Sequence, residues 1–213
     1  MMQPFLDRFP LVAILRGVTP DEVVPIGQVL VANGFTIIEV PLNSPEPIES
    51  IRRLAQALGP DILVGAGTVT QADQVGVIGR AGGRLVVMPH SDAEIVRAAK
   101  AAGMACAPGV ATPTEGFAAL KNGADALKLF PAEAMTPAVL RAWSSVFPEG
   151  TRFLPVGGIT PQAMEPYIAA GATGFGLGSA LYKPGFDART VGERAAAFAA
   201  AWTRFKDTGP TAR

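Results

Sequence analysis

Three ionisable residues stand in stretches that otherwise read as buried strands. Lys128 lies in ALKLFPA, Glu39 in TIIEVPL and Arg16 in LVAILRG. A charge is expensive to bury without a partner, so charges in such runs need a reason. Burial lowers the pKa of a lysine and leaves a neutral amine that can attack a carbonyl to form a Schiff base. A nearby carboxylate can move the protons of that reaction, so these residues predict carbonyl chemistry.

The same charges also have a purely structural interpretation. Lys128 could point outward and run past a helix into solvent, with Glu39 as its ion-pair partner. In a barrel of parallel strands, however, catalytic groups lie at the C-terminal strand ends, and alternate strands contribute to the same inner layer. Glu39 and Lys128 fall in the second and sixth strand candidates, so they could meet inside such a barrel. The match of three charges to strand ends favours a site.

The elements that would position these residues repeat along the chain. Short apolar or β-branched runs alternate with helix-like segments, which is typical of βα units and a parallel sheet. The strand candidates are residues 11–17, 36–42, 62–68, 84–89, 104–109, 126–132, 152–158 and 174–179. The sequence therefore predicts an α/β fold, a (β/α)₈ TIM barrel that forms a single domain over residues 1–213. A doubly wound open sheet is the rival fold.

Helix signals separate the strand candidates. Thr or Ser followed by Pro is a favoured helix start, and Gly commonly ends a helix. Segments with both signals are residues 19–34, 44–59, 112–123 and 160–171. We therefore expect helices that begin directly after Thr19, Ser44, Thr112 and Thr160.

The composition excludes several classes of function. Eighteen Lys and Arg balance eighteen Asp and Glu, and no run of like charge suggests nucleic acid or a membrane surface as partner. Cys106 and His90 are the only residues of their types, so neither a disulfide framework nor a metal site is expected. No apolar run is long enough to span a bilayer, and the N-terminal residues lack signal-peptide features. We expect a cytoplasmic enzyme with a small-molecule substrate.

Glycine-rich turns end the last two strand candidates. PVGGITP contains Gly157 and Gly158, and GFGLGSA contains Gly178 and Ser179. Gly lets backbone N–H groups approach a ligand, and the loops after the seventh and eighth strands commonly form the phosphate site of a TIM barrel. The glycines could serve only as tight turns, but their occurrence after both strands predicts phosphate binding.

The motifs together resemble a known family. AILRG, EVPLNSP, GAGTV, KLFPAE, VGGITP and GLGSALY occur in the order and spacing of the bacterial class I 2-keto-3-deoxy-phosphosugar aldolases, the KDPG/KDPGal aldolase family. The resemblance covers nearly the whole chain. It implies a TIM barrel, usually a homotrimer, that cleaves a phosphorylated keto acid to pyruvate and D-glyceraldehyde 3-phosphate. The reaction that it implies needs no metal and no cofactor.

The resemblance also implies roles for individual positions. Lys128 matches the Schiff-base lysine and Glu39 matches the general acid/base. Arg16 and Thr68 match groups that hold the pyruvyl part of the substrate. The positions that match the pocket wall or the phosphate site are Pro89, Pro108, Gly157, Gly158 and Ser179.

Two positions indicate which substrate epimer is cleaved. Siblings that act on the 6-phosphogluconate-derived keto acid tend to carry Arg where Asn43 stands and Thr where Val156 stands. Asn43 and Val156 therefore favour the galactonate-derived epimer, with the gluconate-derived epimer or dual specificity as alternatives. More distant alternatives are a phosphosugar epimerase or isomerase on a phosphate-binding barrel, and a non-catalytic phosphosugar-binding module.

Overall fold

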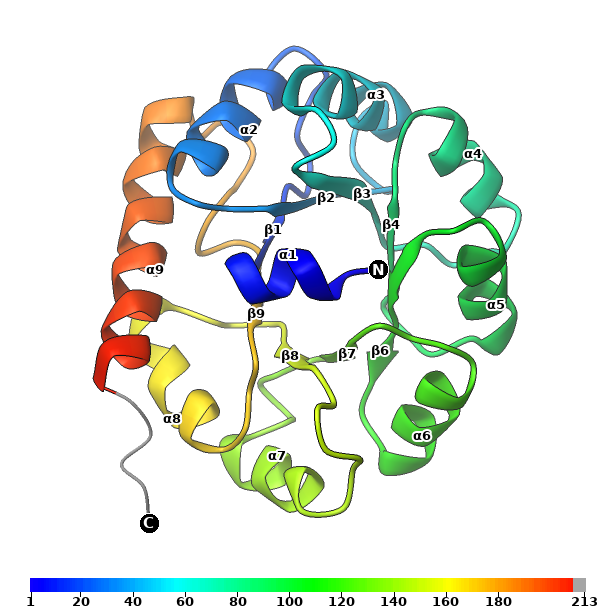
Figure 1. Cartoon of the computed structure of the whole chain (residues 1–213). Coiled ribbons are helices and arrows are strands. Elements are labelled where there is room, and N and C mark those ends of the chain that lie inside the picture. Colours follow the sequence, from blue (N-terminus) through cyan, green and yellow to red (C-terminus); the bar gives the residue numbers. More distant parts are fainter. Residues whose placement is uncertain (209–213) are drawn as a thin grey trace.

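Parallel strands form a barrel at the centre of the molecule (Figure 1). The computed structural model describes residues 1–208, and the end of the predicted domain, residues 209–213, lies outside the described part. The strands are β1 (Leu11–Ile14), β2 (Ile37–Pro41), β3 (Leu63–Gly67), β4 (Leu85–Val87), β5 (Ala105–Ala107), β6 (Gly109–Val110), β7 (Leu127–Leu129), β8 (Phe153–Pro155) and β9 (Phe175–Leu177). Every strand pair is parallel.

Two sheets together close the ring of strands. The larger sheet has the order β5-β4-β3-β2-β1-β9, and the smaller has the order β6-β7-β8. Only Pro108 separates β5 from β6, and a parallel bridge between Val156 and Gly176 joins the end of β8 to β9. Each predicted strand run contains a strand, with β5 and β6 sharing the fifth position. The predicted (β/α)₈ barrel is therefore confirmed, and the open doubly wound sheet is wrong.

Helices surround the barrel and cover the outward faces of its strands (Figure 1). They are α2 (Val23–Ala32), α3 (Pro47–Leu58), α4 (Gln74–Arg80), α5 (Ala93–Ala101), α6 (Pro113–Lys121), α7 (Pro137–Ser144), the 3₁₀ turn η1 (Pro161–Ala163), α8 (Met164–Ala169) and α9 (Ala188–Thr208). Outward strand residues such as Ala13 and Ile38 share one apolar core with the helices. Within residues 1–208, no helix has the length and apolar character needed to cross a membrane.

The predicted helix starts are correct at Thr112 and Thr160. Thr112 forms a capping box with Glu115 at the start of α6, and the Thr160 hydroxyl accepts the N–H of the third residue along. The prediction for Thr19 is wrong, because α2 begins only at Val23. The Thr19 hydroxyl donates to the Glu22 carboxylate at 2.6 Å, and no backbone N–H of a described residue donates to it as to a helix cap.

The predicted start at Ser44 is also wrong. The helix α3 begins at Pro47, after Glu46 takes a left-handed conformation with φ of 40°. The Ser44 hydroxyl instead accepts the N–H of Gly17 at 2.9 Å. This hydrogen bond ties the loop after β2 to the loop after β1, on the side of the barrel where the candidate site lies.

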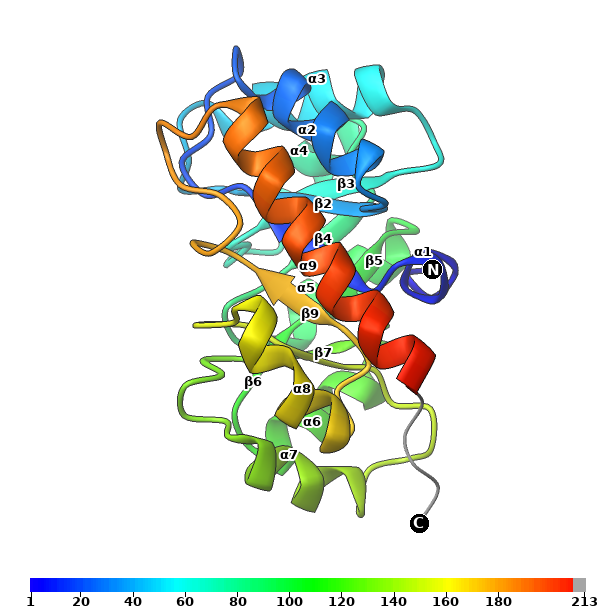
Figure 2. The ribbon, with the colours of Figure 1, turned by 90° about the vertical axis from the view of Figure 1, so that its left-hand side faces the viewer.

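A short helix that the sequence did not predict covers the opposite end of the barrel. This helix, α1 (Gln3–Arg8), crosses the barrel in Figure 1 and lies opposite the loops after β1 and β9 in Figure 2. Its Leu6 and the preceding Met2 are buried against inward side chains that include Val12 and Ile37. The barrel interior is therefore apolar at the α1 end, and charged groups appear only farther along the strands.

Candidate active site

Glu39 on β2 and Lys128 on β7 both point into the barrel. Side chains two residues apart lie on the same face of a strand, and Ile37 and Ala126 belong to the inner apolar cluster. Glu39 and Lys128 line one small cavity inside the barrel and are only 1% and 7% exposed. The alternative in which Lys128 points outward is therefore wrong.

Burial shifts the pKa of both groups toward their neutral forms. Loss of solvation raises the Glu39 pKa from 4.5 to about 7, although the charges of Lys128 and Arg16 oppose this rise. Burial lowers the Lys128 pKa, while Glu39 opposes that change and Arg16 adds to it. A neutral amine is a nucleophile, and a carboxyl group with a pKa near 7 both accepts and releases protons at neutral pH.

Gly67 on β3 leaves the space that the Glu39 carboxylate occupies. The register of β2 and β3 pairs Pro41 with Gly67, and a Cβ at residue 67 would collide with both Glu39 carboxylate oxygens. The buried Oε2 of Glu39 makes no hydrogen bond with any group in the described part of the chain. Buried polar atoms are nearly always paired, so this oxygen is available to a substrate or a water.

Arg16 is held by two polar side chains at the same end of the barrel. Its Nη1 donates to Oδ1 of Asn43 at 2.6 Å, and its Nη2 lies 3.4 Å from Oγ1 of Thr68. Thr68 has φ of 56°, a left-handed conformation that side-chain-bearing residues seldom adopt. Strained backbone of this kind is concentrated at functional sites. Both predicted substrate contacts, Asn43 and Thr68, orient the guanidinium.

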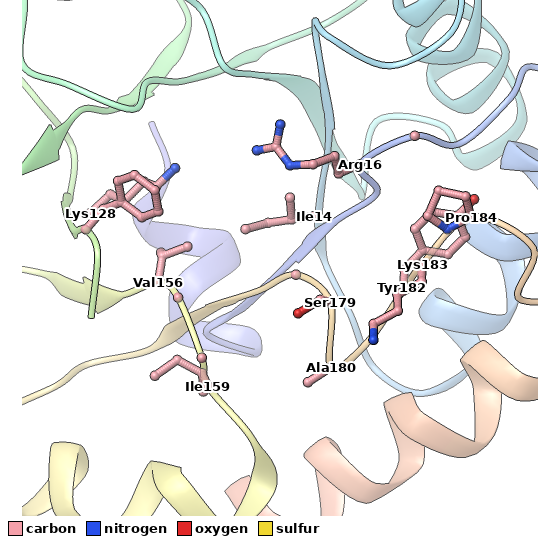
Figure 3. A pocket seen from close by; sticks show the side chains of 15 residues that line it. Ile14, Arg16, Lys128, Val156, Ile159, Ser179, Ala180, Tyr182, Lys183 and Pro184 are labelled. Carbon is pink, nitrogen blue, oxygen red and sulfur yellow. The ribbon is translucent and has the colours of Figure 1, made fainter. Parts of the chain in front are cut away.

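A cavity of about 370 Å³ opens beside Lys128 at this end of the barrel (Figure 3). Predicted site residues in its wall are Arg16, Lys128, Val156, Gly157, Gly158, Gly178 and Ser179. Figure 3 shows Lys128 and Ser179 on opposite sides of the cavity, with the Lys128 ammonium directed toward Arg16. The predicted nucleophile and the predicted phosphate site thus line the same cavity. Within residues 1–208, no three His, Cys, Asp or Glu side chains gather as metal ligands would.

Other predicted residues lie outside the wall of this cavity. They are Glu39, Asn43, Thr68, Pro89 and Pro108. Glu39 lies in the smaller cavity that it shares with Lys128. Pro89 and Pro108 follow β4 and β5. The Pro108 carbonyl accepts a hydrogen bond from the backbone N–H of Lys128 at 2.9 Å. Pro108 therefore supports the strand that carries the lysine.

Some cavity residues were not predicted from the sequence. The Lys128 ammonium lies 4.7 Å from the centre of the Phe130 ring, a cation–π contact. Tyr182 and Lys183 also line the cavity and follow closely after Ser179 in the chain. A lysine so close to a predicted phosphate-binding turn was the available signal for Lys183.

The chain is similar to known proteins over most of its length. The family model described as KDPG and KHG aldolase matches residues 2–190. The 2-dehydro-3-deoxy-6-phosphogalactonate aldolase of Escherichia coli (strain K12) is 43% identical over 195 residues, which cover 92% of this chain and 95% of that protein.

Solved structures share the same barrel. The native KDPGal structure has a TM-score of 0.91 and 42% identity, and the match covers 92% of this chain and 96% of that one. The KDPG aldolase of Legionella pneumophila, with pyruvate captured at low pH as a covalent carbinolamine intermediate, has a TM-score of 0.80 and 27% identity over 94% of this chain and 96% of that one. Both measures are higher for the KDPGal structure.

Proposed function

Because the chain belongs to the KDPG and KHG aldolase family, we propose that it cleaves 2-dehydro-3-deoxy-6-phospho-D-galactonate to pyruvate and D-glyceraldehyde 3-phosphate. The protein is a class I aldolase, a carbon–carbon lyase. The observation that carries this function is the buried Glu39 and Lys128 pair beside a cavity with a glycine-rich far side. Membership of this family leaves no place for the phosphosugar isomerase or the non-catalytic binding module.

We assign the role of nucleophile to Lys128. Its neutral amine attacks C2 of the keto acid, a C–N bond forms as the C=O π bond breaks, and the proton that the nitrogen loses is taken up by the ketone oxygen. The resulting carbinolamine loses this oxygen as water, with a proton from Glu39, and leaves an iminium ion on Lys128. The lowered Lys128 pKa supports this step, because only the unprotonated amine can attack.

The C3–C4 bond breaks in the next step, with Glu39 as the base. The Glu39 carboxylate accepts the proton of the C4 hydroxyl, and the electron pair of the C3–C4 bond moves into the iminium. This releases D-glyceraldehyde 3-phosphate and leaves an enamine. Glu39 returns a proton to C3, and water then hydrolyses the iminium to free pyruvate and Lys128. A pKa of about 7 suits a group that both accepts and donates a proton.

The other cavity residues orient the substrate in this proposal. Arg16, held by Asn43 and Thr68, binds the carboxylate of the pyruvyl part. The turns around Gly157 and Gly178 bring backbone N–H groups and the Ser179 hydroxyl to the phosphate. Gly157 and Gly158 have φ of 116° and 63°, so the first turn depends on glycine.

Reduction of the Schiff base tests the mechanism. Incubation with pyruvate and sodium borohydride should attach a reduced pyruvyl group to Lys128, which peptide mass spectrometry detects. The Lys128→Ala variant should lose both the adduct and turnover, whereas Lys121→Ala, at the exposed end of α6, should keep both. No adduct on the wild-type chain, under conditions that trap a known class I aldolase, would contradict the mechanism.

The choice of epimer needs a separate test. Asn43 and Val156, together with the higher similarity to the KDPGal structure, support the galactonate-derived substrate. A lactate dehydrogenase-coupled assay with both keto acids should give the higher kcat/KM for the galactonate-derived epimer. Equal values would replace the preference with dual specificity and leave the Schiff-base chemistry unchanged.

We also propose that the active protein is a homotrimer. The family resemblance in the sequence motifs supports this assembly. Sedimentation equilibrium should give three times the mass of one chain, and a monomer at assay concentrations would contradict the proposal.

A further inference from the structure

Lys183 is a cation in the wall of the 370 Å³ cavity that has no role in the reaction above. Arg16, Lys128 and Lys183 all line this cavity, and no Asp or Glu does. The Lys183 side chain is exposed and forms no ion pair or hydrogen bond with another described residue. It is therefore free to pair with an anion that enters the cavity.

The backbone of Lys183 is fixed close to the predicted phosphate site. The N–H groups of Leu181 and Tyr182 bond to the carbonyl of Gly178 at 2.8 and 3.0 Å, so the chain turns directly after this glycine. Tyr182 is only 2% exposed and anchors the turn in the core. Figure 3 places Lys183 on the same side of the cavity as Ser179 and away from Lys128.

The phosphate group of the substrate needs a cation that the glycine turns and Ser179 do not supply. A phosphate monoester carries nearly two negative charges at pH 7, whereas the glycine turns and Ser179 supply only neutral donors. The Glu133 carboxylate lies against Gly157 and Gly158, where an added Cβ would contact it, and its negative charge opposes phosphate binding. Arg16 and Lys128 are committed to the pyruvyl end, so Lys183 is the cation left for the phosphate.

We propose that Lys183 binds the phosphate group and makes the site selective for phosphorylated aldehydes. The identity of the substrate rests on the proposed function, but the pairing of Lys183 with phosphate rests on the cavity and its charges. This role adds a charge-assisted contact to the neutral donors of the two turns. Lys183 is thus a specificity-determining residue and takes no part in proton transfer.

The condensation reaction with pyruvate tests this role. The measured quantity is kcat/KM for D-glyceraldehyde 3-phosphate divided by kcat/KM for unphosphorylated D-glyceraldehyde. Lys183→Ala should lower this ratio about tenfold, as expected for the loss of one charge-assisted contact. Lys183→Arg should keep most of the preference, and Lys121→Ala, an exposed lysine outside the cavity, should leave the ratio unchanged.

An unchanged ratio in Lys183→Ala, or an equal loss with both aldehydes, would overturn the proposal. Calorimetric titration with inorganic phosphate separates this result from a failure of the proposed function, because it needs no turnover. Weaker phosphate binding by Lys183→Ala supports the inference even if wild-type protein does not cleave the galactonate-derived keto acid. Cleavage of that keto acid together with unchanged phosphate binding in Lys183→Ala would remove Lys183 from the site and leave the aldolase function in place.

Discussion

The buried carboxylate of Glu39, to which we assign the proton transfer, lowers the stability of the folded protein at high pH. Its pKa in the folded protein, about 7, lies above the ordinary value of 4.5. Between these two values the folded protein keeps a proton that the unfolded chain releases. The contribution of Glu39 to stability is therefore full at low pH and is lost as the pH rises through about 7. At about 1.36 kcal/mol per pKa unit, the loss in the free energy of unfolding amounts to about 3 kcal/mol.

Replacing Glu39 by Gln should make the protein more stable at pH 8 and less active. The amide keeps the size of the side chain but carries no charge, so the free energy of unfolding should rise by up to about 3 kcal/mol at pH 8 and hardly change at pH 4. Loss of the proton-transfer group that we propose should lower kcat by about 10² to 10⁴. Urea unfolding at both pH values and the coupled assay measure these effects.

The matched control for this prediction is Glu165→Gln, which changes an exposed carboxylate on α8. It should leave both the pH dependence of unfolding and kcat as in the wild type. If Glu39→Gln raised the free energy of unfolding equally at pH 4 and pH 8, the effect would not come from the buried charge.

At the scale of the strands, Gly67 on β3 has no side chain and so leaves room for the Glu39 carboxylate on β2. The Cβ in Gly67→Ala would collide with the Glu39 carboxylate, so either that group or the strand must move. We expect a loss of about 1 to 3 kcal/mol in the free energy of unfolding, which is typical of overpacking. We also expect at least about a tenfold lower kcat, because the proton transfer that we propose depends on the position of Glu39. Unfolding curves and steady-state kinetics check both effects.

A glycine in a helix provides the control for this substitution. A Cβ at Gly192 in α9 meets only the Cβ of Val29, at 3.7 Å, which is an ordinary contact. Gly192→Ala should therefore keep wild-type kcat and raise stability by about 0.5 to 1 kcal/mol. Wild-type kcat in Gly67→Ala would show that the Glu39 position tolerates the added methyl group.

The elements that the sequence predicted correctly are those with strong local signals. Each barrel strand is a short apolar run, and the charge of Lys128 or Glu39 inside such a run was visible without knowledge of the fold. The start of α3 was predicted wrongly because Ser44 has the residue type of a cap but bonds to Gly17 on a distant loop. The helix α1 was missed because its six residues are too few to show a helical period.

The parts of the site that could not be predicted depend on loops that only the closed barrel brings together. The hydrogen bond between Arg16 and Asn43 joins the loops after β1 and β2. The space for the Glu39 carboxylate depends on the register between two strands. Neither feature leaves a periodic pattern in the chain, although the residues that form them, Arg16, Glu39, Asn43 and Gly67, lie in the motifs AILRG, EVPLNSP and GAGTV that resemble the family.

At the scale of the whole molecule, the distribution of charge matters more than its sum. The formal net charge is zero, yet the 370 Å³ cavity is lined by three basic side chains, Arg16, Lys128 and Lys183, and by no Asp or Glu. A substrate with a carboxylate and a phosphate is therefore attracted by a local field and not by the protein as a whole. Such a field acts over about 8 Å at physiological salt and weakens as the ionic strength rises.

Salt should therefore weaken the reaction selectively for the phosphorylated aldehyde. Raising the KCl concentration from about 0.05 M to about 0.5 M shortens the screening length by roughly threefold. We expect kcat/KM for D-glyceraldehyde 3-phosphate to fall several-fold in condensation with pyruvate, and kcat/KM for D-glyceraldehyde to change much less. Sucrose at equal osmolarity controls for effects that are not ionic. Equal salt slopes for the two aldehydes would show that the cations of the cavity do not attract the phosphate, since only one of these aldehydes carries that charge.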